Sequence, residues 1–266
     1  FCLAHPKKVN AIVGKKKTDR EDSKALADLL RTNLLPMSYI PTHHERDLKE
    51  LLRFRSHLVE QRSTYKRRAH DILDKQNIHC EFSNIFGKRA KEWISNLNCP
   101  APYQTELNTL IRLSEEVEAE IKKYEELIEG CEGADENVEL LKSIPGIGSV
   151  LALTLSSEIG DVKRFKDARA LASYAGVVPR VHSSGDKTHY GPVSKEGNKY
   201  IRWALAEAMV HIAGEGKPLH NFYEEMKQRK GSGKARVAVM NKLIRIIYYM
   251  LIRREKYRME GKSATD

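Results

Sequence analysis

The sequence is poor in cysteine and has no long apolar run. Its four cysteines are scattered at Cys2, Cys80, Cys99 and Cys131, without the CxxC spacing of a zinc ligand pair. This usage argues against a zinc site and is typical of free thiols in a reducing cytosol, so we expect a cytoplasmic protein. No segment approaches the roughly 18 apolar residues that cross a bilayer, which argues against a membrane partner.

An initiator methionine and a signal-peptide pattern are also missing. The chain begins at Phe1, and its first 17 residues are short, irregular segments with a candidate strand at 9–13. We therefore expect a chain that lacks its natural N-terminus.

Positive charge is in excess and unevenly placed. The 266 residues carry a formal net charge of +10, and the isoelectric point is about 9.3, which favours a polyanionic partner. Residues 115–139 hold eleven acids against two lysines, whereas residues 227–262 hold twelve basic residues against two acids. We expect nucleic acid to meet the C-terminal part and avoid the acidic segment. The alternative is that both runs are solvated helix faces.

Helical patterns dominate the chain. Two long helices, at about 45–76 and 103–129, flank a linker with a short helix at 90–97 and predict an antiparallel helical hairpin or coiled coil. Apolar stripes predict further helices at 198–213 and 234–258. The fold class is therefore mainly α.

Two carboxylates stand one turn apart near the N-terminus. Thr18 and Glu21 form a capping box that starts a helix, and Asp19 and Asp22 share one face of it. Acids favour a helix N-terminus, which accounts for Asp19. Asp22 aligns with the apolar stripe of this helix, where a carboxylate needs a partner such as a metal ion. Structural and metal-binding roles both stay open.

A glycine-containing turn at residues 144–148 (IPGIG) joins two apolar helical segments. This pattern is typical of a helix-hairpin-helix, in which Gly146 and Gly148 let backbone N–H groups face a DNA phosphate. A hairpin used only for packing is the alternative.

Residues 173–205 hold the densest group of chemically active side chains. Ser183 and Ser184 precede Gly185, with Arg180 and Lys187 close by, and cations around a hydroxyl suit a phosphate. A second turn at 194–198 contains Lys195 and Asn198 and leads into a helix. Glycine allows the hydroxyl to be presented on a loop, but a solvated turn would have the same composition.

These motifs, in order, resemble the DEDD-type insertion-sequence transposases, the bridge-RNA-guided serine recombinases. The matching segments are IPGIG at 144–148, YAGVVPR at 174–180, SSG at 183–185 and SKEGN at 194–198 with Arg202. The run KTDRED at 17–22 matches the last two acids of the family's RuvC-like tetrad.

The resemblance implies three domains: the end of an RuvC-like α/β domain at 1–42, a helical spacer at 43–135, and a helical transposase domain at 136–266. It implies Mg²⁺ at Asp19 and Asp22, with the tetrad's first Asp and its Glu absent from this sequence. It also implies DNA and a structured guide RNA as partners, composite sites in a homo-oligomer (dimer or tetramer), and association with the nucleoid.

The implied reaction is attack by a serine hydroxyl on a DNA phosphodiester. Ser184 is the expected nucleophile, because the family's serine immediately precedes the glycine, and Ser183 is the fallback. The expected nucleic-acid contacts are Gly146, Gly148, Arg180, Lys187, Lys195, Asn198, Arg202, Lys242 and Arg245. Two other classes stay open: a non-enzymatic DNA-binding protein, and a metal-dependent structure-specific nuclease or resolvase that uses water.

Overall fold

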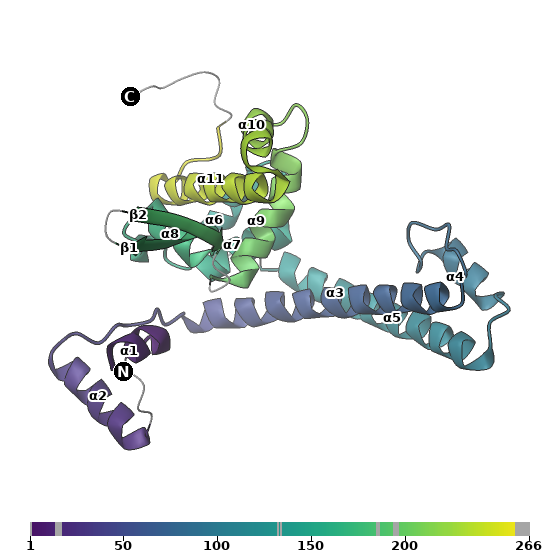
Figure 1. The fold of residues 1–266 in the computed structure, drawn as a ribbon, viewed down its shortest axis with the longest axis horizontal. Coiled ribbons are helices and arrows are strands. Elements are labelled where there is room, and N and C mark those ends of the chain that lie inside the picture. Colours follow the sequence, from purple (N-terminus) through teal and green to yellow (C-terminus); the bar gives the residue numbers. More distant parts are fainter. Residues whose placement is uncertain are drawn as a thin grey trace. The chain divides into compact units, whose positions relative to one another are not determined.

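The part of the chain that the structure describes is mainly helical, as the sequence predicts (Figure 1). The computed structural model describes residues 2–13, 18–131, 133, 135–184, 187–193 and 197–258, with the backbone alone described at 180–184, 187–190 and 192. The chain divides into two units, Phe1–His44 and Glu45–Asp266. No helix in the described ranges is long and apolar enough to cross a membrane.

The N-terminal unit consists of α1 (Pro6–Val13) and α2 (Asp19–Arg31), with an isolated β-bridge between Ala4 and Met37. The strand predicted at residues 9–13 is wrong, because these residues complete helix α1. Pro6 starts that helix, where its missing N–H costs nothing, and the N–H groups of Lys8 and Val9 donate to the carbonyl of His5. Local capping therefore overrides the β preference of the valines and isoleucine.

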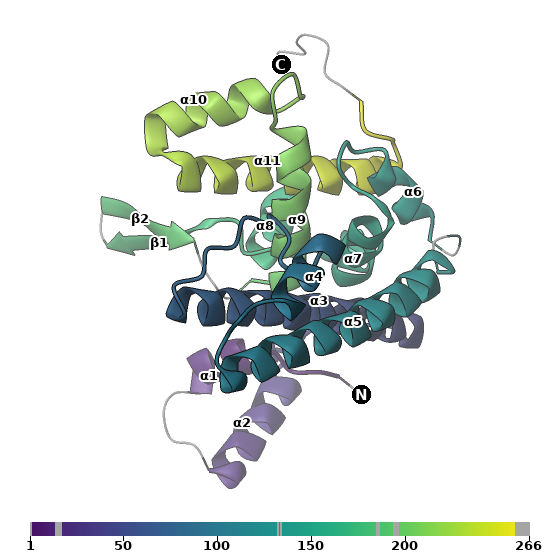
Figure 2. The same ribbon diagram turned by 90° about the vertical axis from the view of Figure 1, so that its right-hand side faces the viewer.

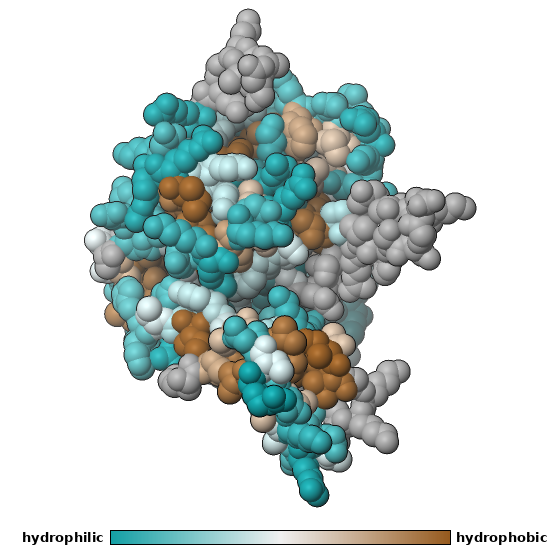
Figure 3. Space-filling view, turned by 90° about the vertical axis from the view of Figure 1, so that its left-hand side faces the viewer, coloured by the Kyte–Doolittle hydropathy of each residue, from teal (hydrophilic) through white to brown (hydrophobic). Residues whose placement is uncertain are grey.

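Helix α2 begins where the capping box predicts. The Thr18 hydroxyl accepts from the Glu21 N–H at 3.3 Å. The prediction that Asp22 aligns with a buried stripe of Ala25, Leu26 and Leu29 is wrong, however. Leu26 is 37% exposed, Ala25 and Leu29 are half-buried, and no described residue before 45 is buried. Hydrophobic side chains consequently lie on the surface of this unit, in the lower part of the view in Figure 3. Asp22 is half-buried rather than set in an apolar core.

A helical hairpin follows. Helices α3 (His43–Lys75) and α5 (Ala101–Glu129) run side by side, and α4 (Lys88–Ser95) lies at their connected end (Figures 1 and 2). At 1.5 Å per residue, α3 is about 50 Å long. An apolar cluster that includes Ile72, Ile94 and Leu107 fixes the connected end, while Leu48, Leu52 and Ile128 join the larger core at the other end.

The acidic run belongs largely to this hairpin, where its carboxylates pair with the basic side chains of α3. Ion pairs join Arg55 to Glu125 and Arg62 to Glu118. Glu106, which precedes the acidic run on α5, pairs with Arg68 at 2.6 Å. Matching opposite charges on the two helices fixes their register. The acidic segment read from the sequence thus has an intramolecular role, because its carboxylates pair with cations of α3.

The rest of the chain packs around α7. Its elements are α6 (Glu136–Lys142), α7 (Ser149–Ile159), η2 (Val162–Arg164), α8 (Ala168–Tyr174), β1 (Pro179–Ser184), β2 (Lys187–Val193), α9 (Lys199–Ile212), α10 (His220–Lys230) and α11 (Ser232–Arg253). Every residue of α7 from Ala152 to Ile159 is buried. Helices α6, α9 and α5 pack on α7, and α11 packs on α8, α9 and α10.

Candidate functional site

The serine pair lies on a β-hairpin, where the sequence predicted a loop. Strands β1 and β2 are antiparallel, with Ser183 opposite Thr188 and Ser184 opposite Lys187. Directly opposed residues have Cα atoms roughly 5 Å apart, so the pairing brings Ser184 and Lys187 together. The glycine–aspartate pair between them, residues 185 and 186, lies outside the described part of the chain, as do the side chains of residues 180–184, 187–190 and 192. A one-residue irregularity in the ladder falls at Arg180.

Two of the sequence motifs meet just before this hairpin and just before α9. The Asn198 N–H donates to the carbonyl of Tyr174 at 2.8 Å. Gly176 has a φ of +70°, and a Cβ added to Gly197 would lie only 2.2 Å from the Gly176 Cα. No residue other than glycine fits at 197 unless the backbone moves. The YAGVVPR and SKEGN segments are therefore held against each other, although Lys195 lies outside the described residues.

Asn198 closes the start of α9. Its Oδ1 accepts from the N–H groups of Tyr200 and Ile201 at 2.9 and 3.2 Å. These two backbone donors are consequently engaged within the protein, as expected for an N-cap residue.

A buried carboxylate anchors Asn198. The Glu158 side chain on α7 is 3% exposed, and its Oε2 accepts from the Asn198 Nδ2 at 2.9 Å. Arg53 on α3 donates to the same carboxylate through Nε at 2.8 Å and Nη2 at 3.0 Å. The Arg53 guanidinium lies over the Tyr200 ring, 4.8 Å from its centroid.

Arg53, Glu158 and Asn198 thus join α3, α7 and the start of α9 in one network of charge-assisted hydrogen bonds. The hydrogen bonds that Arg53 donates to Glu158, together with the charge of the carboxylate, raise the pKa of Arg53. Partial burial of the guanidinium opposes this shift. Sequence reasoning missed both Glu158 and Arg53. A usable signal was present, because Glu158 is the single acid in the apolar segment 149–159 and a buried carboxylate requires a partner.

Arg202 lies one turn into α9, against the same glycine contact. Its Nη1 is buried, and the structure gives it no hydrogen-bond partner among the described residues. A Cβ on Gly176 would lie 2.7 Å from that nitrogen. A buried guanidinium nitrogen of this kind needs an acceptor, which water or a ligand oxygen can supply. Arg202 and Asn198, both predicted from the sequence, are thus brought together.

The glycine turn between α6 and α7 lies away from Asn198, near the C-terminal end of α9. Gly146 has a φ of +85° and is exposed, and Gly148 is the N-cap of α7, where it has no side chain to cap the helix. A Cβ on Gly146 would lie 2.3 Å from the Cβ of His211, near the C-terminal end of α9. Asn198 and His211 are 13 residues apart on one helix, roughly 20 Å. The predicted phosphate-binding residues therefore fall at opposite ends of α9.

The basic residues predicted on α11 differ in exposure. The Lys242 ammonium lies over the Phe222 ring, 4.8 Å from its centroid, and the residue is half-buried. Arg245 is exposed. The Lys242 ammonium therefore already contacts an aromatic ring of the protein, whereas the Arg245 side chain faces solvent.

The predicted metal ligands do not form a complete site. Asp19 is exposed and Asp22 half-buried on the first turn of α2. Within the described ranges, no group of three or more His, Cys, Asp or Glu side chains is placed to hold a metal ion. Mg²⁺ requires near-octahedral coordination, usually from carboxylates and several waters. Two carboxylates one turn apart supply only part of that shell.

Comparison with known families gives this arrangement a context. The family described as "Transposase IS116/IS110/IS902 family" matches residues 138–224, which hold the glycine turn, the serine hairpin and α9. The DEDD-type family described as "Transposase" matches residues 2–78, which hold Asp19 and Asp22.

Curated relatives agree. The transposase for insertion sequence element IS1111A of Coxiella burnetii is 29% identical over 96% of this chain and 72% of its own length. A probable family 20 transposase of Pseudomonas aeruginosa is 28% identical over 96% of this chain and 78% of its own length. The pilin gene-inverting protein of Moraxella bovis is 36% identical over 42% of this chain and 36% of its own length.

The matched families are those of enzymes that cut and join DNA, and a DEDD-type domain generally uses a divalent metal ion. Together, the two family models and the relatives that match 96% of the chain support its assignment to the IS110/IS116 family of insertion-sequence transposases.

Proposed function

We propose that the chain transfers DNA strands by means of a serine nucleophile, Ser184. The observation that carries the proposal is the convergence of three motifs: Tyr174 and Gly176 contact Gly197 and Asn198, and the hairpin bearing Ser184 begins three residues after Gly176. A site for phosphodiester chemistry needs its nucleophile and its phosphate-binding groups on rigidly connected elements. The buried Glu158 cluster supplies that rigidity at the start of α9.

The proposed step forms a bond between Ser184 Oγ and phosphorus and breaks the bond between phosphorus and the 3′ oxygen of the DNA. The serine proton leaves to a base or solvent, and the departing 3′ oxygen takes up a proton. A phosphoserine and a free 3′ hydroxyl result, which conserves the phosphodiester for rejoining to another strand. Lys187, opposite Ser184, and Arg202, next to Gly176, are the cations assigned to the phosphate.

Metal assistance is part of the proposal. Asp19 and Asp22 would contribute two of the carboxylates, with the remaining ligands coming from outside the described residues. A divalent ion would stabilise the negative charge that develops on the phosphate oxygens. Selection of target DNA by a guide RNA and assembly as a homo-oligomer with composite sites also belong to the proposal, and rest on the family resemblance.

Phosphate contacts are assigned to the uncapped start of α7 beside Gly146 and Gly148, used as a helix-hairpin-helix, and to Arg245 and Lys242 on α11. Helix N-termini bind phosphate through free N–H groups, and each neutralised phosphate releases counterions. Inversion of a DNA segment is a second candidate outcome of the same strand exchange, favoured by the match to the pilin gene-inverting protein.

The test traps the intermediate. The chain is incubated with DNA of its own insertion sequence and with RNA that co-purifies from the cell, and the mixture is denatured and run on a gel. A denaturant-resistant protein–DNA adduct is expected, absent in Ser184→Ala and retained in Ser183→Ala. Loss of the adduct only in Ser183→Ala would make the neighbour the nucleophile. Cleavage without an adduct in any variant would identify water as the nucleophile, as in a nuclease, and overturn the proposal.

A further inference from the structure

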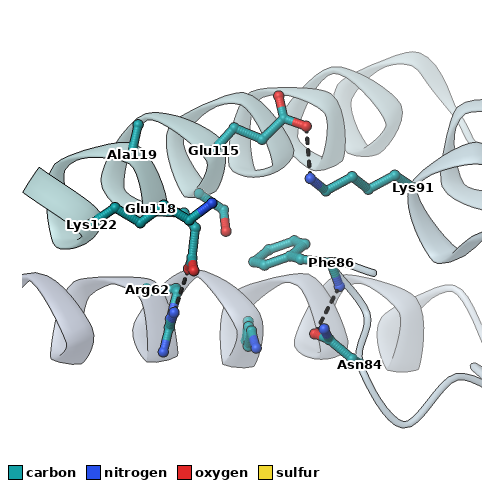
Figure 4. A pocket seen from close by; sticks show the side chains of 10 residues that line it. Arg62, Asn84, Phe86, Lys91, Glu115, Glu118, Ala119 and Lys122 are labelled. Atoms are coloured by element: carbon teal, nitrogen blue, oxygen red, sulfur yellow. Dashed lines mark hydrogen bonds and ion pairs between the residues drawn. The ribbon is translucent and has the colours of Figure 1, made fainter. Parts of the chain in front are cut away.

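The helical hairpin contains a cavity of about 490 Å³ between α3 and α5, at the side facing residues 84–86 (Figure 4). It lies between the apolar cluster at the connected end of the hairpin and the larger core. Its volume falls in the range of roughly 300–1,000 Å³ that is usual for small-molecule sites. No part of the strand-transfer site described above contributes to it.

The cavity is lined by four cations and two carboxylates. Arg62 pairs with Glu118, and Lys91 pairs with Glu115 at 2.7 Å (Figure 4). The two other cations, Lys66 and Lys122, form no ion pair with any described residue. Positive charge therefore exceeds negative charge by two within the cavity, which favours an anion and disfavours a metal cation.

The pKa of Glu118 reflects the excess of positive charge in the cavity. The hydrogen bond from Arg62 lowers the pKa of Glu118, and the charges of Lys122 and Lys66 lower it further, against the opposing effect of desolvation. Both free ammonium groups thus act on the one carboxylate that Arg62 already neutralises. An anion entering the cavity would meet them without displacing an existing ion pair.

The remaining lining suits a planar ring with polar edges. Phe86 lies between the two helices in Figure 4, and its backbone N–H donates to the Asn84 side-chain oxygen at 3.3 Å. Ser114 on α5 also lines the cavity and is only 4% exposed. The cavity therefore offers an aromatic ring, an amide and a hydroxyl beside the two ammonium groups of Lys66 and Lys122. This combination suits a nucleotide, with its base on the ring and its phosphate at the lysines.

We propose that this cavity binds one unpaired nucleotide of a nucleic-acid strand, with its phosphate at Lys66 and Lys122 and its base against Phe86. The cavity is open on one side. The bases of a duplex are stacked and paired, so their faces are not available to Phe86, whereas an unpaired base can lie against its ring. The hairpin is thereby a single-strand contact separate from the strand-transfer site. The chemistry is shared by DNA and RNA, and the test distinguishes them.

The chain offers a matched control on the same helix. Lys122 lines the cavity, whereas its neighbour Lys123 is 65% exposed and pairs with Glu120 at 2.6 Å. Lys122→Gln and Lys123→Gln remove the same charge from adjacent positions. Affinity for short fluorescent oligonucleotides (single-stranded DNA, single-stranded RNA and duplex DNA) is measured across a salt series.

We expect Lys122→Gln to weaken single-strand binding and to reduce its salt slope by about 0.7, while Lys123→Gln changes neither. Phe86→Leu, which keeps an apolar side chain, should weaken single-strand binding by about fivefold or more. Both variants should keep duplex binding and the circular dichroism spectrum of the parent. Tighter binding of one single strand identifies the source as DNA or RNA. Equal effects of the two lysine changes, equal losses on duplex, or no single-strand binding would each overturn the proposal.

Discussion

The two units of the chain differ in the burial of their apolar residues. In the described part of residues 45–266, leucine and isoleucine side chains fill two buried clusters. In residues 2–13 and 18–44 none is buried, and seven of the twelve large exposed hydrophobic residues of the described chain lie there. The described residues of the unit that carries Asp19 and Asp22 therefore include no buried core, whereas the unit that carries the serine hairpin has one.

A pair of leucine substitutions gives the largest contrast. Leu205 on α9 is fully buried, and Leu30 on α2 is 54% exposed. Leu205→Ala should lower the free energy of unfolding by about 3 kcal/mol through lost burial and a cavity, whereas Leu30→Ala should change it by less than about 0.5 kcal/mol. Urea unfolding followed by circular dichroism measures both. A large loss in Leu30→Ala would show that α2 is covered in solution.

The carboxylates provide the next contrast. Removing the buried Glu158 in Glu158→Ala leaves Arg53 and Asn198 without their acceptor. Because the Arg53 side chain is 40% exposed and can turn to water, we expect a loss of about 2 kcal/mol, less than for a fully buried pair. Asp22 is half-buried in a unit whose described residues form no core, so Asp22→Asn should be nearly neutral. Thermal unfolding of both variants checks this, and similar small shifts would mean that the Glu158 cluster does not hold α3, α7 and α9 together.

Two glycines within the C-terminal unit allow a comparison with a smaller expected difference in stability. Gly197→Ala places a methyl group against the Gly176 backbone and should cost about 1–2 kcal/mol. A Cβ at Gly148 meets nothing within 4 Å, and its φ of −88° is open to alanine. The weaker N-cap preference of alanine is offset by the lower freedom of its unfolded chain, so Gly148→Ala should change stability by less than about 0.5 kcal/mol. Melting temperatures measure the difference. Equal values for the two variants would contradict the close contact between the YAGVVPR and SKEGN segments.

Local signals predicted the helices well. The capping box placed the start of α2, and apolar periodicity located α3, α5, α9 and α11 to within a few residues. These features depend on neighbouring residues, which a sequence displays directly. The motif order also identified the family before any coordinates.

Long-range partners were beyond the sequence. The strand pairing of Ser184 with Lys187 and the contact of Gly176 with Gly197 depend on tertiary packing. For helix α2 the sequence predicted a contact that is not seen. Its amphipathic pattern predicted a buried face, but the described residues do not cover that face. Periodicity shows which face is apolar, but the element that covers it has to be supplied by the fold.

The account's central claim is that Ser184 forms the covalent bond to DNA, and mass spectrometry of the trapped adduct tests it most directly. Trypsin cuts after Arg180 and after Lys187, which releases residues 181–187 as one peptide that contains both serines. After nuclease digestion of the bound DNA, fragmentation of this peptide should place a nucleotide phosphate on Ser184. A nucleotide on Ser183, on another peptide, or on no peptide while the DNA is cut would contradict the claim.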